Sequence, residues 1–205
     1  MTMTRLFAAA FLLLIFAIAH AADATVGGEI TLLKGRATVT QGAQTLRLYQ
    51  GASVLVGDRL HTGPGGRLRL HMIDGTDVTL GENTEFIVHE YEFHGDTGIG
   101  VLELTKGFFR AVTGKITKLG NNNFKVKTPL AVIGVRGTDF WGEQNAQRLR
   151  IALLGGTAII VSNDAGEVEI TESGFGTEVA GPGQAPKPPY RWSPDALTRA
   201  AGTVN

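Results

Sequence analysis

Short runs of alternating apolar and polar residues, separated by glycine-containing breaks, follow one another along the chain from Val26 onwards. The clearest run covers residues 67–73, where basic and polar side chains alternate with Leu68, Leu70 and Met72. It ends at Asp74-Gly75, a strong short-range signal for a hairpin turn. Because alternation with a period of two puts successive side chains on opposite faces of a strand, the pattern predicts an all-β fold.

Strand–turn units recur about every 20 to 25 residues, as in residues 68–86, 124–140 and 149–162. That spacing is compatible with the coils of a solenoid or β-helix, in which each unit buries its apolar face on the next. The units are too dissimilar to form a sequence repeat, and a β-sandwich remains the alternative.

The chain is organised around residues 124–141, which read F-K-V-K-T-P-L-A-V-I-G-V-R-G-T-D-F-W. A half-buried strand opens this stretch, and an apolar run interrupted by one charge, Arg136, follows. A guanidinium in an apolar run needs a partner, and Asp139 is the nearest acidic residue in the sequence. Both residues are interpreted as structural, either as an ion pair or with Arg136 hydrogen-bonded to carbonyls where strands turn; an exposed contact for a ligand or partner is the alternative.

Residues 128–140 resemble the closing signature of the FecR domain, a β-rich periplasmic module. Upstream motifs of that family occur in the expected order at residues 56–60, 62–63, 66–67 and 74–83. The resemblance covers residues 54–143 and reaches Gly183 more loosely. It implies a solenoid-like interaction module, whose best-known relatives are anti-sigma regulators with a cytoplasmic segment, one membrane span and a periplasmic part that senses an outer-membrane transporter.

The N-terminus has the pattern of a secretory signal peptide. Arg5 supplies the positive charge, residues 6–18 an apolar stretch, and Ala19-His20-Ala21 a small-residue cleavage site. Thirteen apolar residues are short for a membrane span, which needs about 20. We therefore expect a soluble periplasmic protein that begins at Ala22 and has no stable membrane span. An uncleaved leader, anchored in the inner membrane, is the alternative.

Five segments follow from these patterns. They are a signal peptide (1–21), N-terminal strands that pack on the domain (22–53), the FecR core (54–143), C-terminal strands that continue the β fold (144–181), and a Pro-rich tail with a short helix (182–205). In the tail, Ser193 is the expected N-cap of the helix and Pro194 its first residue.

Composition excludes several classes of function. The 19 basic and 19 acidic residues give no basic surface for nucleic acid, and the absence of cysteine excludes disulfides and thiolate metal sites. None of the four serines lies in a nucleophile elbow. Strand alternation puts Glu90, Glu92 and His94 on one face and His89 on the other. We interpret the acidic face as solvent-exposed and expect no metal there. We also expect no cofactor and no enzymatic activity.

Three aromatic residues are candidates for contact with a ligand. Trp141 follows Phe140 and so faces away from the core, while Tyr190 and Trp192 in the tail either dock back onto the domain or anchor a partner. Our main hypothesis is a non-catalytic scaffold that binds an envelope protein through exposed strand edges or the tail. The alternatives are a binder of peptidoglycan or another saccharide, stacking on these three rings, and a signal-anchored regulatory sensor.

Overall fold

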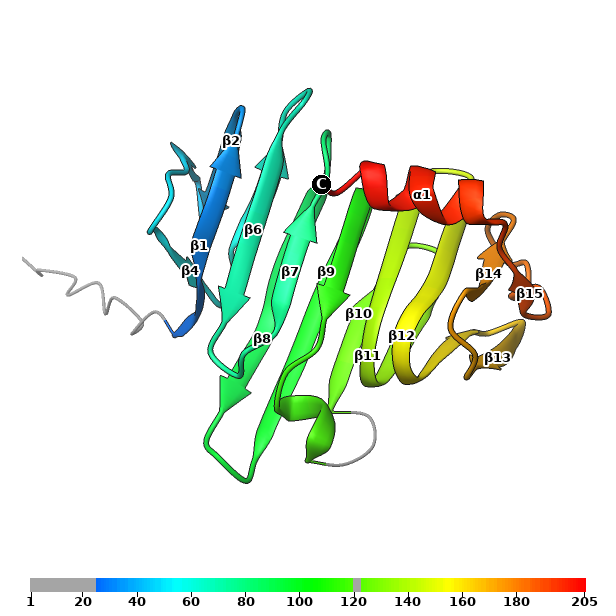
Figure 1. Ribbon diagram of the computed structural model, residues 1–205. Helices are drawn as coiled ribbons and strands as arrows, with labels where there is room; N and C mark the ends of the chain where they lie inside the picture. The colour runs from blue at the N-terminus through cyan, green and yellow to red at the C-terminus, as the bar shows by residue number, and fades with distance from the viewer. Residues whose placement is uncertain (1–24, 120–122) are drawn as a thin grey trace, which may run out of the picture.

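The computed structural model describes residues 25–119 and 123–205, so the predicted signal peptide lies outside the described chain. Fifteen strands of the described chain form one continuous sheet, accompanied by a short 3-10 helix, η1, and one α-helix, α1 (Figure 1). The predicted all-β fold is therefore confirmed. No helix in the described ranges is long and apolar enough to cross a membrane.

The first half of the chain contributes nine strands, which are β1 (Val26–Lys34), β2 (Ala37–Gln41), β3 (Gln44–Arg47), β4 (Ser53–Leu55), β5 (Arg59–Thr62), β6 (Arg67–Met72), β7 (Asp77–Leu80), β8 (Glu85–Phe93) and β9 (Gly98–Val112). The second half contributes η1 (Ile116–Lys118), β10 (Phe124–Lys127), β11 (Val132–Asn145), β12 (Arg148–Asn163), β13 (Gly166–Ile170), β14 (Phe175–Val179), β15 (Tyr190–Arg191) and α1 (Pro194–Gly202).

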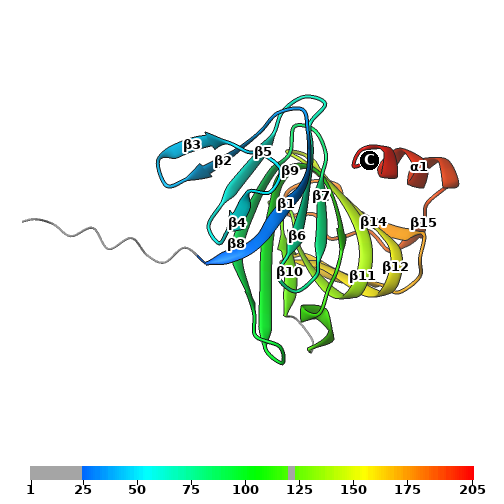
Figure 2. The ribbon, with the colours of Figure 1, turned by 60° about the vertical axis from the view of Figure 1, so that its left-hand side comes forward.

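Three long strands, β9, β11 and β12, fold the sheet into two layers, because each contributes its two halves to different neighbours. The layer that α1 covers, called the α1 layer, has the order β4-β1-β6-β7-β9-β11-β12-β14-β15. The other, called the β13 layer, has the order β3-β2-β5-β8-β9-β10-β11-β12-β13. Figure 2 shows β3, β2, β5 and β8 to the left of β1 and β6.

The long strands pass between the layers at glycines with positive φ, a backbone conformation that other residues rarely adopt. In β9 this residue is Gly107, at φ +102°, and a Cβ there would overlap the side chain of Thr84. In β12 it is Gly156, at φ +100°, where a Cβ would overlap the carbonyl oxygen of Gly137 on β11. A side chain at either position would push the neighbouring strand away, so these glycines set where the sheet folds.

The core lies between the two layers and contains the inward-facing residue of each alternating pair. Phe109 and Phe140 meet edge to face, with ring centroids 5.3 Å apart, and both are fully buried. All strand pairs run antiparallel except β9 with β10. The narrower expectation of a solenoid stays a prediction, and this single folded sheet is compatible with it. The boundaries of the five segments also stay predictions.

The C-terminal helix begins where the sequence predicted. Ser193 is its N-cap and accepts a hydrogen bond from the backbone nitrogen of Ala196 at 3.2 Å, with Pro194 at the first helical position. Helix α1 crosses the outer face of the α1 layer above β11 and β12 (Figure 1). The helix thereby closes an aromatic cluster that the sheet alone would leave open to solvent.

Candidate functional site

The predicted partnership between Arg136 and Asp139 is wrong. Asp139 binds Arg110 of β9 instead, in a bidentate pair with Nε–Oδ1 at 2.8 Å and Nη2–Oδ2 at 2.7 Å. Arg136 reaches Glu169 of β13, with Nη1–Oε1 at 3.4 Å. The reason is that β11 changes layers at Gly137, so Arg136 faces outwards from the β13 layer and Asp139 from the α1 layer.

The Arg110–Asp139 pair links neighbouring strands on the outer face of the α1 layer. The hydrogen bond to Asp139 raises the pKa of Arg110 above its ordinary value. Both side chains are about one-third exposed, so the pair contributes to stability only modestly. The geometry supports a structural role for the charged residues of the signature.

Asp58 and Asp74, two further acidic residues of the family motifs, are buried and satisfied internally. Asp74 accepts hydrogen bonds from four groups: the backbone nitrogen and hydroxyl of Thr76, the backbone nitrogen of Ile116 and the hydroxyl of Tyr91. Asp58 accepts from the backbone nitrogen of Leu55 and the side chain of Gln41. Burial, and next the negative charge of Asp74, raise the pKa of Tyr91. Neither carboxylate is free to act as a base or a metal ligand.

The predicted orientation of His89 is also wrong, because β8 carries a β-bulge between Val88 and Glu90. The extra residue breaks the alternation, so Val88 and Tyr91 both face the core while His89 faces solvent. There its Nε2 lies 2.6 Å from Oε2 of Glu103. Within the described residues, no group of three His, Asp or Glu side chains is placed to hold a metal ion.

The tail docks back onto the domain and buries two of the three candidate aromatic rings. Trp141 is 2% exposed and Trp192 4% exposed, with their rings edge to face at 5.6 Å. Trp141 Nε1 donates to Oγ1 of Thr203 at 2.9 Å, and the Arg150 guanidinium lies 4.5 Å from the Trp192 ring centre. A saccharide platform that includes both tryptophans is therefore excluded in this conformation, and only Tyr190, at 39% exposed, keeps an accessible ring.

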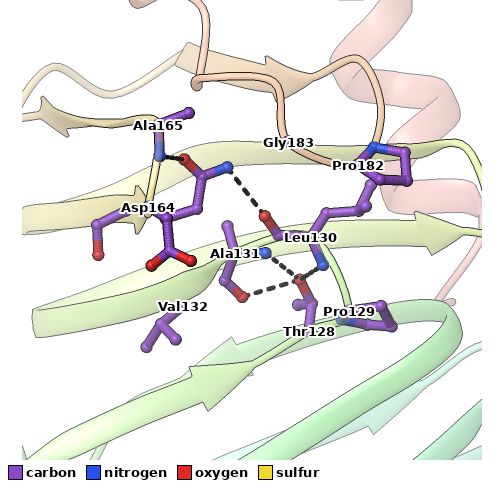
Figure 3. Close-up of a pocket in the computed structure, with 11 residues that line it drawn as sticks. Thr128, Pro129, Leu130, Ala131, Val132, Asp164, Ala165, Pro182 and Gly183 are labelled. Atoms are coloured by element: carbon purple, nitrogen blue, oxygen red, sulfur yellow. Dashed lines mark hydrogen bonds between the residues drawn. The ribbon is translucent and has the colours of Figure 1, made fainter.

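The family signature also forms one wall of an open groove of about 560 Å³ (Figure 3). Residues 128–131, which connect β10 to β11, and Val132, the first residue of β11, line one side. The β12–β13 turn at Asp164 and Ala165 and the start of the tail at Pro182 and Gly183 line the other. Three segments that are distant in sequence therefore meet at this end of the sheet.

Two polar side chains hold the groove in shape. The Thr128 hydroxyl accepts from the backbone nitrogens of Leu130 and Ala131 and donates to the carbonyl of Ala131 (Figure 3). Asn163 donates to the carbonyls of Leu130, at 3.1 Å, and Gln184, at 2.7 Å. The exposed residues that line the groove are Pro129, Val132, Asp164, Ala165, Pro182 and Gly183, of which Asp164 alone is charged.

Sequence reasoning located one wall of the groove but missed Asn163, Pro182 and the partner of Asp139. Arg110 lies in an alternating strand, where no sequence motif distinguishes it from other outward-facing residues, and it is 29 residues from Asp139. The β12–β13 turn was recognisable as a turn, but its neighbours in space were not.

Comparison with known proteins identifies the class. The sequence model described as "FecR protein" matches residues 58–159, which include Asp58, Asp74 and Asp139. The chain therefore belongs to the FecR domain family, as the motifs predicted. No curated protein sequence matches the chain.

Two crystal structures of a putative anti-sigma factor from Parabacteroides distasonis ATCC 8503, at 2.50 and 1.65 Å resolution, share the fold. The TM-scores are 0.55 and 0.54 at 17% sequence identity. In each case the match covers 68% of this chain and 62% of the other, so this chain spans less than two thirds of that protein's length. At this identity the likeness shows the fold alone.

Proposed function

We propose that this chain is a non-catalytic interaction module of the FecR type, which binds a protein partner in the cell envelope through the groove at its signature turn. The observation that carries the proposal is the construction of that groove, where the signature segment, the β12–β13 turn and the tail meet. The side chains of Thr128 and Asn163 are hydrogen-bonded within the walls, and the exposed lining includes Pro129, Val132 and the carboxylate of Asp164. Such a surface suits binding better than chemistry.

The charged residues of the motifs support a role without catalysis. Asp58, Asp74 and Asp139 are each occupied by donors from other elements. A general base or nucleophile needs a free, accessible position next to substrate, which these carboxylates lack. Family membership is in line with a role in regulation or envelope sensing, since the structural relatives are described as anti-sigma factors.

Groove binding can be tested by photo-crosslinking in cells that express the full chain. A photoreactive amino acid replaces Val132 in the groove or, as a matched control, Val112, which is similarly exposed but lies on the α1 layer. We expect a discrete protein adduct from position 132 only. Asp164→Lys should reduce that adduct, because it reverses the one charge among the described residues that line the groove. Equal adducts from both positions, or none from position 132, would overturn the proposal.

We further propose that the chain acts in the periplasm, on the strength of the leader pattern in residues 1–21. Fractionation with mass determination of the N-terminus tests this. The expected species is soluble, periplasmic and begins at Ala22. A membrane-bound species that retains Arg5 would contradict it and favour an anchored sensor.

A further inference from the structure

The β13 layer ends in two strands that each pair on one side only. At one end β3 pairs with β2 alone, and at the other β13 pairs with β12 alone. Figure 1 shows β2 and β13 at opposite sides of the molecule, and Figure 2 shows β3 at the rim beyond β2. An edge strand offers a row of backbone hydrogen-bonding groups to any strand that can reach it.

The pairing of each edge strand with its neighbour shows which residues direct their backbone N–H and C=O groups outwards. A two-residue turn joins β2 to β3, with Gln41 opposite Gln44, and another joins β12 to β13. In such hairpins the pair next to the turn is hydrogen-bonded and the pairs then alternate. Thr45 therefore belongs to a non-hydrogen-bonded pair, as its close side-chain contact with Thr40 indicates, at 3.1 Å between the hydroxyl oxygens. The free backbone groups accordingly lie at Thr45 and Arg47 on β3, and at Glu167 and Glu169 on β13.

The two edges carry opposite charges. Residues 164–178, around β13, contain five acidic residues and no basic one. Residues 30–61, around β3, contain four basic residues and one acidic residue, Asp58, which is buried. Charged residues commonly protect an edge strand because like charges repel when two identical edges meet. In this chain each edge repels the same edge of a second copy but attracts the unlike edge of that copy. Charge repulsion therefore does not prevent β3 of one copy from meeting β13 of another.

Strand direction also favours pairing between the unlike edges. From β3 to β13 the layer contains seven antiparallel pairs and one parallel pair, so β3 and β13 point in opposite directions. A second copy in the same orientation would thus place its β3 antiparallel to the first copy's β13, which is the slightly more stable arrangement.

One register between β3 of one copy and β13 of the next suits the side chains on both faces of the two strands. With Arg47 opposite Glu167, Thr45 lies opposite Glu169 and the outward backbone groups match. Leu46, which is 48% exposed although it faces the same side as buried Val39, then lies opposite the partly buried Val168. The contact would cover the exposed leucine and give Glu167, which forms no ion pair within the described chain, an arginine partner.

We propose that copies of this chain associate head to tail, with β3 of one copy adding to β13 of the next and extending the β13 layer from one molecule to another. The contact is heterologous, since different surfaces of the two copies meet, and it therefore propagates into a chain or a ring. This self-association goes beyond binding at the signature groove and needs neither Pro129 nor Val132.

Proline variants at the two edges give a direct test. Thr45→Pro and Glu169→Pro each remove one outward N–H and leave the backbone hydrogen bonds of the parent sheet in place, although each also loses a side-chain contact, with Thr40 or with Arg136. The purified proteins are compared by light scattering after size exclusion, at low ionic strength and over a range of concentrations. We expect the unmodified protein to form species larger than a monomer, which dissociate in about 1 M salt, where charges are screened within about 3 Å.

Each proline variant alone should be monomeric, because it keeps only one of the two unlike edges. An equimolar mixture of the two should give a species of twice the monomer mass and nothing larger, since one intact β13 edge and one intact β3 edge remain. Thr45→Ala, which keeps the N–H, is the matched control and should assemble like the unmodified protein. Thermal unfolding confirms that each variant folds, and Arg47→Glu and Glu167→Lys replace any proline variant that does not.

Three results would overturn the proposal. One is an unmodified protein that stays monomeric at all concentrations and low salt. Another is self-association of Glu169→Pro alone, which would indicate contact between two β3 edges. The third is a mixture of the two variants that remains monomeric.

Discussion

The hydroxyl of Tyr91 on β8 donates a 2.7 Å hydrogen bond to Oδ1 of Asp74, which lies in the turn between β6 and β7. The two residues belong to different layers, and both are buried. The same carboxylate accepts from the backbone nitrogen of Ile116 in η1. A residue that reads in the sequence as ordinary turn chemistry therefore joins the two layers and the 3-10 helix at one point in the interior.

Removing the hydroxyl in Tyr91→Phe should lower the free energy of unfolding by about 1 to 3 kcal/mol, because a buried carboxylate loses one donor. Denaturant unfolding measures the change. Tyr49→Phe is the matched control, since Tyr49 is exposed and its hydroxyl should contribute less than about 0.5 kcal/mol. Equal effects of the two variants would show that the bond to Asp74 adds no stability.

The raised pKa of Tyr91 predicts a loss of stability in alkaline solution. The ordinary pKa of tyrosine is 10.0, and in the folded protein burial and the charge of Asp74 raise it. Above about pH 10 the unfolded chain releases this proton while the folded chain retains it, so the unfolded state binds fewer protons and stability falls as pH rises.

Denaturation at about pH 8 and about pH 11 tests this pH dependence. The decrease in unfolding free energy should be smaller in Tyr91→Phe than in the unmodified protein. An identical decrease in both would assign the alkaline loss to other groups.

The two arginines near the signature should differ in their contributions. Arg110→Ala should cost about 1 kcal/mol, since it breaks a bidentate pair, and Arg136→Ala less than about 0.5 kcal/mol, since its 3.4 Å contact with Glu169 is half exposed. Double-mutant cycles with Asp139→Ala and Glu169→Ala measure each coupling energy. A larger coupling for Arg136 than for Arg110 would contradict this assignment.

Docking of the tail predicts a large effect of Trp192→Ala. The substitution removes a buried ring and should lower the free energy of unfolding by about 3 kcal/mol. It should also expose Trp141, the one tryptophan that remains, and shift its fluorescence to longer wavelength. Tyr49→Ala is the control, because Tyr49 is 67% exposed and lies outside the tail, so little change is expected in either measurement. An unshifted spectrum in Trp192→Ala would show that the tail does not cover Trp141.

Local features of the fold were predictable from residues close together in sequence. Alternation with a period of two and the Asp74-Gly75 turn are set by neighbouring residues, and they led to an all-β prediction that is confirmed. The N-cap at Ser193 is equally local, because its hydrogen bond spans three residues. The family motifs occur in a fixed order along the chain, so they identified the FecR domain without knowledge of its packing.

The tertiary structure alone decided which distant residues meet. Asp139 binds Arg110 and not Arg136, because β11 changes layers at Gly137 and separates the two nearest charges. Trp141 donates a hydrogen bond to Thr203, 62 positions away, and one bulge in β8 turns His89 outwards. Contacts of this kind depend on strand register and on where each strand bends. The alternation of apolar and polar residues is the same for every register that keeps one face buried, so it does not distinguish between those registers. The sequence thus determined the strands and the family, while the folding of the sheet on itself determined the ion pairs, the groove and the two free edges.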